Sequence, residues 1–128
     1  MEEKIKKFAE DLLSLPNEIF ALQVAMIEMH EDSQEISEKI TLRESEIKSE
    51  INAATDENGK KMYSNEESRK IAFLNDASSD SELVDLGKKK RELDVAVQSM
   101  RAKIEMKSNL QRNLRSIMGV MAGLSVEA

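Results

Sequence analysis

Apolar residues recur in steps of three, four and seven along much of the chain, and this spacing is its most restrictive feature. From Ile19 to Ala54 the series contains Leu22, Met26, Met29, Ile36, Ile40, Ile47 and Ile51. Such steps place the side chains on one narrow stripe of one long helix. A narrow stripe needs an apolar partner, so the pattern predicts a long helix paired with another.

Part of this series also repeats every eleven residues. Met29, Ile40 and Ile51 are eleven apart, as are Ile36 and Ile47. An eleven-residue repeat predicts a helix pair that is nearly straight or slightly right-handed.

A second stripe follows after residue 64 and predicts a second arm over 64–122. It begins with Ile71 and Leu74 and weakens near 78–81, where Ser79 and Glu82 form a capping-box pattern that predicts a break. Beyond the break, the stripe contains Leu83, Leu86, Lys90, Leu93, Val97, Met100 and Ile104. After a skipped step it resumes with Leu110, Leu114, Ile117 and Met121.

Residues 55–63 separate the two stripes and predict a turn. Asn58-Gly59 supplies the left-handed backbone conformation that a chain reversal needs. Ser64 and Glu67 form a further capping-box pattern, with Ser64 as the N-cap of the second arm.

The chain before the first arm predicts a short helix over residues 2–14. Ile5, Phe8 and Leu12 have helical spacing there, and Pro16 fits the first turn of a new helix, which would be the first arm over 17–54. The expected fold is therefore all-α. It is a single domain over 1–128, a long antiparallel α-helical hairpin resembling a coiled coil, with a short N-terminal helix and a kinked second arm.

The composition favours long helices and offers little for catalysis. Only 3% of residues are aromatic and 34% are charged, with four Gly, one Pro and no Cys, so disulfides and thiolate metal sites are excluded. The only histidine, His30, lacks a second nitrogen ligand, and acidic residues on thin helices lack the desolvated pocket of an acid–base pair. We expect no enzyme activity, no metal and no cofactor.

Charge is divided unevenly along the chain. Residues 1–57 hold 6 Lys/Arg and 15 Asp/Glu, whereas residues 88–115 hold 9 and 3. Folding about Asn58-Gly59 would place Glu28, Glu31 and Asp32 near 88–91. The alternative is contact of this basic stretch with nucleic acid phosphates. Its candidate residues are Lys88, Lys89, Lys90, Arg91, Arg101, Lys103, Lys107, Arg112 and Arg115.

The residues near the two termini predict a hydrophobic end opposite the turn. The candidates are Phe8, Leu12, Leu13, Leu114, Ile117, Met118, Met121 and Leu124. Two interpretations stay open for them: a self-association or partner-docking site, and a small local core that closes the hairpin. A homo-oligomer, a dimer or higher, and a protein partner are both consistent with this end.

The N-terminus is charged and lacks the apolar run of a signal peptide. We expect a soluble cytoplasmic protein with no membrane contact, because apolar runs fall short of a membrane span and Glu2, Glu3, Glu10 and Asp11 would repel anionic lipid.

Residues 56–70, from Asp56-Glu57-Asn58-Gly59 to Ser68-Arg69-Lys70, resemble a turn segment in small uncharacterised helical proteins of bacterial phages and prophages. The resemblance covers about fifteen residues. It implies a bacterial or phage-infected cytoplasm, near DNA replication or recombination functions, and carries over no catalytic residue. The layout also resembles prefoldin-like chaperones, but the β-hairpins that those proteins place between their helices have no strand signal here.

The sequence therefore predicts a structural or adaptor protein that binds proteins or itself through a helical hairpin. The alternatives are a phage or bacterial DNA replication or recombination accessory protein, acting through the basic second arm, and a holdase-like chaperone. The same stripes would also satisfy a swapped dimer in which two chains pair arm to arm.

Overall fold

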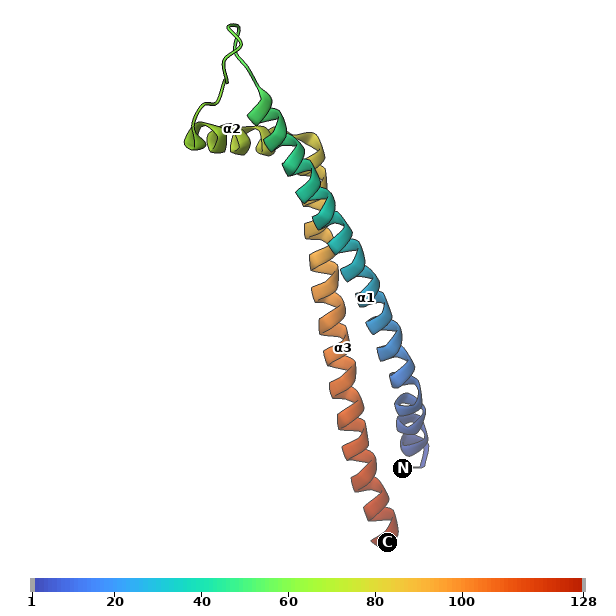
Figure 1. Cartoon of the computed structure of the whole chain (residues 1–128). Coiled ribbons are helices and arrows are strands. Elements are labelled where there is room, and N and C mark those ends of the chain that lie inside the picture. The colour runs from blue at the N-terminus through green and yellow to red at the C-terminus, as the bar shows by residue number, and fades with distance from the viewer. Residues whose placement is uncertain (1, 128) are drawn as a thin grey trace. The chain divides into compact units, whose positions relative to one another are not determined.

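The computed structural model describes the backbone of residues 2–127 and the side chains of residues 2–123. It consists of three helices, α1 (Glu2–Ala53), α2 (Glu66–Ser79) and α3 (Ser81–Glu127), and within the described residues it contains no strand (Figure 1). The expectation of an all-α fold in which the long helix α1 packs against a second arm is confirmed.

The chain divides into two compact units, where the sequence predicted one domain. Unit 1 comprises Met1–His30 and Val95–Ala128, and unit 2 comprises Glu31–Asp94. Each unit contains a part of α1 beside an antiparallel part of α3, and α2 belongs to unit 2.

The prediction of a separate helix over 2–14 is wrong, because α1 is continuous and Pro16 lies inside it. Proline lacks the N–H that would bond to the carbonyl of Leu12 and normally interrupts a helix. Here Leu12, Leu15 and Ile19, on both sides of Pro16, are buried or half-buried residues of unit 1. Packing of the flanking turns therefore outweighs the local preference of one residue.

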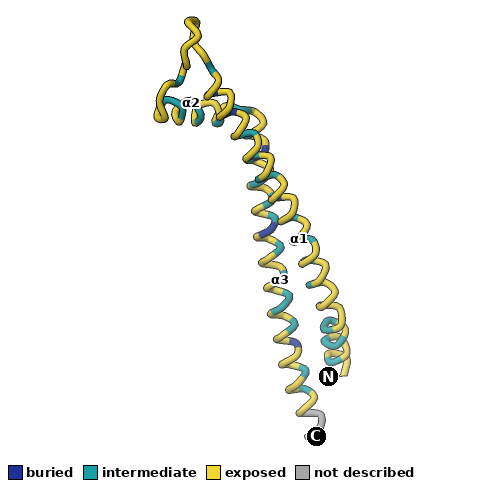
Figure 2. The backbone as a smooth tube through the Cα atoms, viewed as in Figure 1, coloured by how far each residue is buried: buried dark blue, intermediate teal, exposed yellow. Residues whose placement is uncertain are grey.

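Buried and half-buried residues of α1 and α3 recur in alternating steps of three and four, and we call this set the seam (Figure 2). On α1 it comprises Ile5, Phe8, Leu12, Leu15, Ile19, Leu22, Met26, Met29, Ser33, Ile36, Ile40, Arg43 and Ile47. On α3 it comprises Leu83, Leu86, Lys90, Leu93, Val97, Met100, Ile104, Lys107, Gln111, Leu114, Met118 and Met121.

This alternation gives a seven-residue repeat along the seam. The residues of the expected eleven-residue repeat, Met29, Ile36, Ile40, Ile47 and Ile51, are also buried or half-buried. The expected skipped step on α3 is wrong. Lys107 and Gln111 continue the seam without interruption, while Leu110 and Ile117 lie outside it and are 46% and 41% exposed. Polar residues at seam positions concealed this regularity from an argument based on apolar spacing.

The core of unit 2 forms where α2 meets the end of α1. Ile47, Ile51 and Ala72 are its buried residues, and Tyr63, Phe73 and Leu83 pack against them. Ala72 permits close approach because its side chain is small. In Figure 1, α2 runs across the end of α1 in this unit.

The turn between α1 and α2 is fixed by Asp56 and Gly59. The Asp56 carboxylate accepts hydrogen bonds from the backbone N–H groups of Asn58 (2.9 Å) and Lys60 (3.0 Å). Gly59 has φ 77°, which confirms the expected left-handed residue. An isolated antiparallel bridge joins Thr55 and Lys61 across this turn.

Both predicted helix caps are one residue too early. The N-cap of α2 is Asn65, whose side chain accepts a 2.7 Å hydrogen bond from the Ser68 backbone N–H in a capping box, so Ser64 and Glu67 do not form the box. Asp80 is the non-helical residue between α2 and α3, and its carboxylate accepts from the Leu83 backbone N–H at 3.0 Å. The interruption itself does fall within the expected segment 78–81.

Candidate interaction surface

The residues predicted to form a hydrophobic end belong to unit 1 and divide into two groups. Phe8, Leu12, Leu114, Met118 and Met121 lie in the seam, and Leu114 is only 5% exposed. Leu13 and Ile117 lie outside it, and Leu13 is 78% exposed. The side chain of Leu124 lies outside the described residues. The first group forms a local core, and the second belongs to the free surface.

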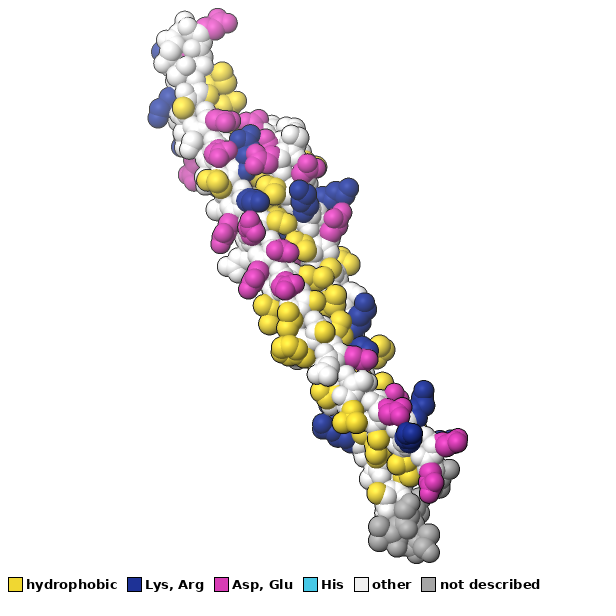
Figure 3. All heavy atoms as spheres, turned by 90° about the vertical axis from the view of Figure 1, so that its right-hand side faces the viewer, with side chains coloured by type: hydrophobic (Ala, Val, Ile, Leu, Met, Phe, Trp, Pro, Cys, Tyr) yellow, Lys and Arg dark blue, Asp and Glu magenta, His cyan; other side chains and the backbone are white. Residues whose placement is uncertain are grey.

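The free surface of unit 1 carries many more large apolar side chains than sequence reasoning selected. Fourteen large hydrophobic side chains are exposed in the described part of the chain, and nine of these belong to unit 1. They are Leu13, Phe20, Val24, Ile27, Val95, Met106, Leu110, Ile117 and Val120. Figure 3 shows hydrophobic side chains gathered among charged ones on the face that it presents.

A signal for these residues was present in the sequence. Most lie directly beside a seam residue, as Phe20 does beside Ile19 and Ile117 beside Met118. One narrow stripe per helix accounts for the pairing of α1 with α3, and the additional apolar residues form further stripes. A two-helix pair has no layer to cover them.

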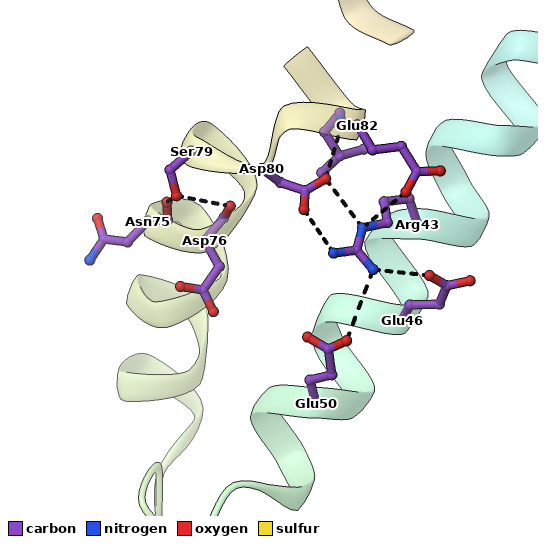
Figure 4. A network of polar contacts seen from close by, with 9 residues as sticks. Arg43, Glu46, Glu50, Asn75, Asp76, Ser79, Asp80 and Glu82 are labelled. Atoms are coloured by element: carbon purple, nitrogen blue, oxygen red, sulfur yellow. Dashed lines mark hydrogen bonds and ion pairs between the residues drawn. The ribbon is translucent and has the colours of Figure 1, made fainter. Parts of the chain in front are cut away.

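Arg43 is the centre of the densest polar network, where α1 meets the start of α3 in unit 2 (Figure 4). Its guanidinium donates to both carboxylate oxygens of Asp80, at 2.7 and 3.2 Å, and to Glu46 at 3.0 Å. Glu82 and Glu50 lie 3.4 and 3.9 Å away. The bond from Arg43 and the capping bond from Leu83 lower the pKa of Asp80, and Asp80, followed by Glu46, raises the pKa of Arg43.

This network joins two elements and was missed by the sequence argument. Arg43 occupies a seam position between Ile40 and Ile47, so its spacing was the available signal. A charged side chain at a mostly covered position requires a partner. The network links the middle of the first arm to the cap of α3.

The expected pairing of Glu28, Glu31 and Asp32 with residues 88–91 is wrong in register. Ser33 donates to Asp94 at 3.2 Å, and Asp94 accepts from Lys90 at 3.4 Å, which places Ser33 beside 90–94. Asp32 and Lys89 do line one shallow hollow, together with Glu35. The expectation assumed that the arms pair directly from the turn, whereas α2 occupies fourteen residues before α3 begins.

The nine candidate nucleic-acid contacts differ in how far they are free. Lys107 is half-buried in the seam and forms a 3.1 Å ion pair with Glu18, and Lys90 pairs with Asp94 on its own helix. The other seven are exposed: Lys88, Lys89, Arg91, Arg101, Lys103, Arg112 and Arg115. His30 is also exposed, and the described residues contain no cluster of three His, Cys, Asp or Glu side chains that could hold a metal ion.

A groove lies between the end of α1 and the start of α2 in unit 2. Its lining includes Lys48, Arg69, Lys70, Phe73 and Leu74, and the Lys48 ammonium lies 4.8 Å from the centre of the Phe73 ring. A cation over an aromatic face is favourable and covers part of the ring. The groove combines apolar and basic groups with one carboxylate, that of Glu66.

By length and composition alone, α1 is long and apolar enough to cross a membrane, whereas the sequence analysis expected its apolar runs to be too short.

In comparisons with protein-family models, curated proteins and solved structures, no match to the chain was found.

Proposed function

We propose that this protein is a non-enzymatic structural or adaptor protein that binds another protein chain through the outer surface of unit 1. The observation that carries the proposal is the exposure of nine large apolar side chains on a unit with only two helices. Exposed apolar surface of this extent on a small charged protein is typical of a protein–protein interface.

The seam supports the same proposal because the nine exposed apolar residues lie outside it and take no part in the pairing of α1 with α3. Its seven-residue repeat is that of a coiled coil, in which two stripes bury each other and no third surface is required. Leu15, Val97 and Leu114 are buried to 5% exposure or less. Additional apolar stripes outside such a pair resemble those of helices in bundles of more than two.

The experiment is light scattering coupled to size exclusion over a range of protein concentrations, at low and high salt. A mass above 14.5 kDa that rises with concentration supports self-association. The Phe20→Glu variant should shift the mass toward the monomer, because a charge cannot be buried in an apolar interface without large cost. The matched control is Leu42→Glu, which changes a similarly exposed residue of unit 2 and should leave the mass unchanged.

The same columns run with a short mixed DNA test the rival function, a phage or bacterial replication or recombination accessory protein. An increase in mass on adding DNA that disappears at high salt would indicate nucleic-acid binding by the seven exposed basic residues and would overturn the proposal. The holdase-like alternative has its own readout, suppression of client aggregation by the wild-type protein but not by Phe20→Glu. A wild-type protein that is monomeric at every concentration would contradict self-association through this surface.

A further inference from the structure

The turn between α1 and α2 presents an asparagine followed by a glycine to solvent. Residues 55–62 are all exposed, and in Figure 1 this turn extends beyond the ends of both helices. Asn58 precedes Gly59, and no other asparagine of the sequence precedes a glycine. A Cβ at Gly59 would meet no atom within 4 Å, so the space around this residue is open. Neighbouring side chains therefore do not shield the Asn58–Gly59 pair.

Asparagine next to glycine is chemically labile without an enzyme. The backbone nitrogen of Gly59 loses its proton and attacks Cγ of Asn58. A bond from this nitrogen to Cγ forms, the bond from Cγ to the side-chain nitrogen breaks, and ammonia leaves, which gives a succinimide ring. Water then opens the ring, to aspartate when it adds at Cγ and to isoaspartate when it adds at the backbone carbonyl carbon. A side chain on the following residue hinders the attack, and glycine has none.

Hydrogen bonds hold the attacking nitrogen in the closed turn. The Gly59 N–H donates to the backbone carbonyl of Asp56 at 3.0 Å. The Asp56 carboxylate accepts from the N–H groups of Asn58 and Lys60, and the Asp56 N–H donates to the Lys60 carbonyl at 2.7 Å. An N–H in such a bond must lose its acceptor before it can lose its proton. The attack on Cγ therefore requires the turn to open.

We propose that Asn58 is a site of spontaneous deamidation through Gly59, and that the hydrogen bonds of Asp56 control its rate by keeping the turn closed. Local opening of an exposed turn costs far less free energy than global unfolding, so the folded protein reacts, but more slowly than the unfolded chain. This inference does not depend on what unit 1 binds. The asparagines inside helices precede residues with side chains and react more slowly; they are Asn17, Asn52, Asn75, Asn109 and Asn113.

The isoaspartyl product changes the turn itself. Its main chain contains one more carbon between residues 58 and 59, and its carboxylate adds a negative charge near Asp56 and Glu57. The spacing that lets one carboxylate accept from residues 58 and 60 is then lost. This turn connects α1 to α2, whose contact forms the core of unit 2, so the modified protein should be cleaved more readily by proteases within 55–63.

The test incubates the full-length protein in mildly alkaline buffer, both folded and in guanidinium chloride. Peptide mass spectrometry detects the conversion of amide to acid at residue 58, and an isoaspartyl-specific methyltransferase detects the isoaspartate. The wild type should be modified at Asn58 in both states, roughly tenfold or more slowly when folded. Asn58→Gln should give neither signal at residue 58, because a longer side chain does not form the favoured ring.

Two substitutions of Asp56 test the control by the turn, with folding checked by circular dichroism. Asp56→Ala removes the side-chain acceptor, so the folded variant should react several-fold faster than the wild type, while the denatured variant should react at the wild-type rate. Asp56→Asn is the matched control. It retains an acceptor oxygen and should remain close to the wild type in both states.

The outcomes separate the site from its control. Modification of Asn58 in guanidinium chloride that is no faster than modification of Asn52 would overturn the site. Equal rates for the folded and the denatured wild type would overturn the control by the turn, and this comparison needs no variant to fold. Equal folded rates for the wild type, Asp56→Asn and Asp56→Ala would overturn the role of the Asp56 carboxylate.

Discussion

Arg43 and Asp80 show how single charged residues determine where the second arm begins. Asp80 interrupts the helix, caps α3 through the Leu83 N–H and receives two hydrogen bonds from Arg43. Asparagine caps a helix about as well as aspartate does, but it has no charge to offer an arginine. The capping and pairing roles of Asp80 can therefore be separated by substitution.

The pairing role predicts a pH dependence of stability. Because Arg43 and the Leu83 N–H lower the pKa of Asp80 in the folded state, its contribution is present above the unfolded-state pKa, about 3.9, and is lost as the pH falls through the lower folded value. Urea unfolding from pH 6 downward should show this loss in the wild type. Asp80→Asn should be less stable at pH 6 and should lack that part of the acid slope, while Asp80→Ala should lose the cap as well. If the free energy of unfolding fell equally with decreasing pH in the wild type and in Asp80→Asn, the pairing role of Asp80 would be contradicted.

Two glycines predict opposite effects of the same substitution. Gly59 has φ 77°, so Gly59→Ala should destabilise the protein by about 1–2 kcal/mol. Gly119 lies inside α3 with open space where a Cβ would be, so Gly119→Ala should stabilise it by about 0.5–1 kcal/mol. Chemical denaturation of both variants is the measurement. The same sign for both would contradict the described turn.

At the scale of elements, apolar periodicity predicted the two long arms and the turn, because narrow stripes and an Asn-Gly pair specify them locally. It did not predict α2 as a separate packed element, since the buried residue of that helix is Ala72, which carries little apolar signal. The caps were shifted by one residue because serine, asparagine and aspartate all cap helices and stand next to each other at 64–65 and 79–80. The register of the arms followed from α2 and was therefore also missed.

Pro16 is the position at which an element contradicts local preference. Pro16→Ala restores the missing N–H and relieves the clash with the preceding turn, so α1 should gain stability, by up to about 3 kcal/mol. Thermal unfolding followed by circular dichroism measures the gain. The neighbouring exposed Asn17→Ala is the control and should shift stability by less than about 1 kcal/mol. A loss of stability in Pro16→Ala would mean that α1 does not continue through this residue.

At the scale of the whole molecule, the candidate surface could be predicted only in part from the sequence. The prediction included Leu13 and Ile117, which are exposed, but it combined them with seam residues such as Leu12 and Leu114. Separating the two groups requires knowing which positions of each helix face the other helix. The seam residues Ser33, Arg43, Lys107 and Gln111 are polar, so a pattern of apolar residues alone does not reveal these positions. Once the positions are known, the remaining apolar residues of unit 1 can be recognised as an additional surface.

The central claim is that α1 and α3 pair within one chain in this register, because the outer stripes are defined relative to that seam. The chain has no cysteine, so a pair can be introduced without background. Glu18→Cys with Lys107→Cys replaces an ion pair of 3.1 Å, while Glu18→Cys with Val120→Cys places the second thiol about 20 Å further along α3. At low protein concentration, a short bifunctional maleimide should cross-link the first pair rapidly within one chain and leave the second pair unlinked. Cross-linking only between chains, or equal rates for the two pairs, would contradict the seam and the surfaces derived from it.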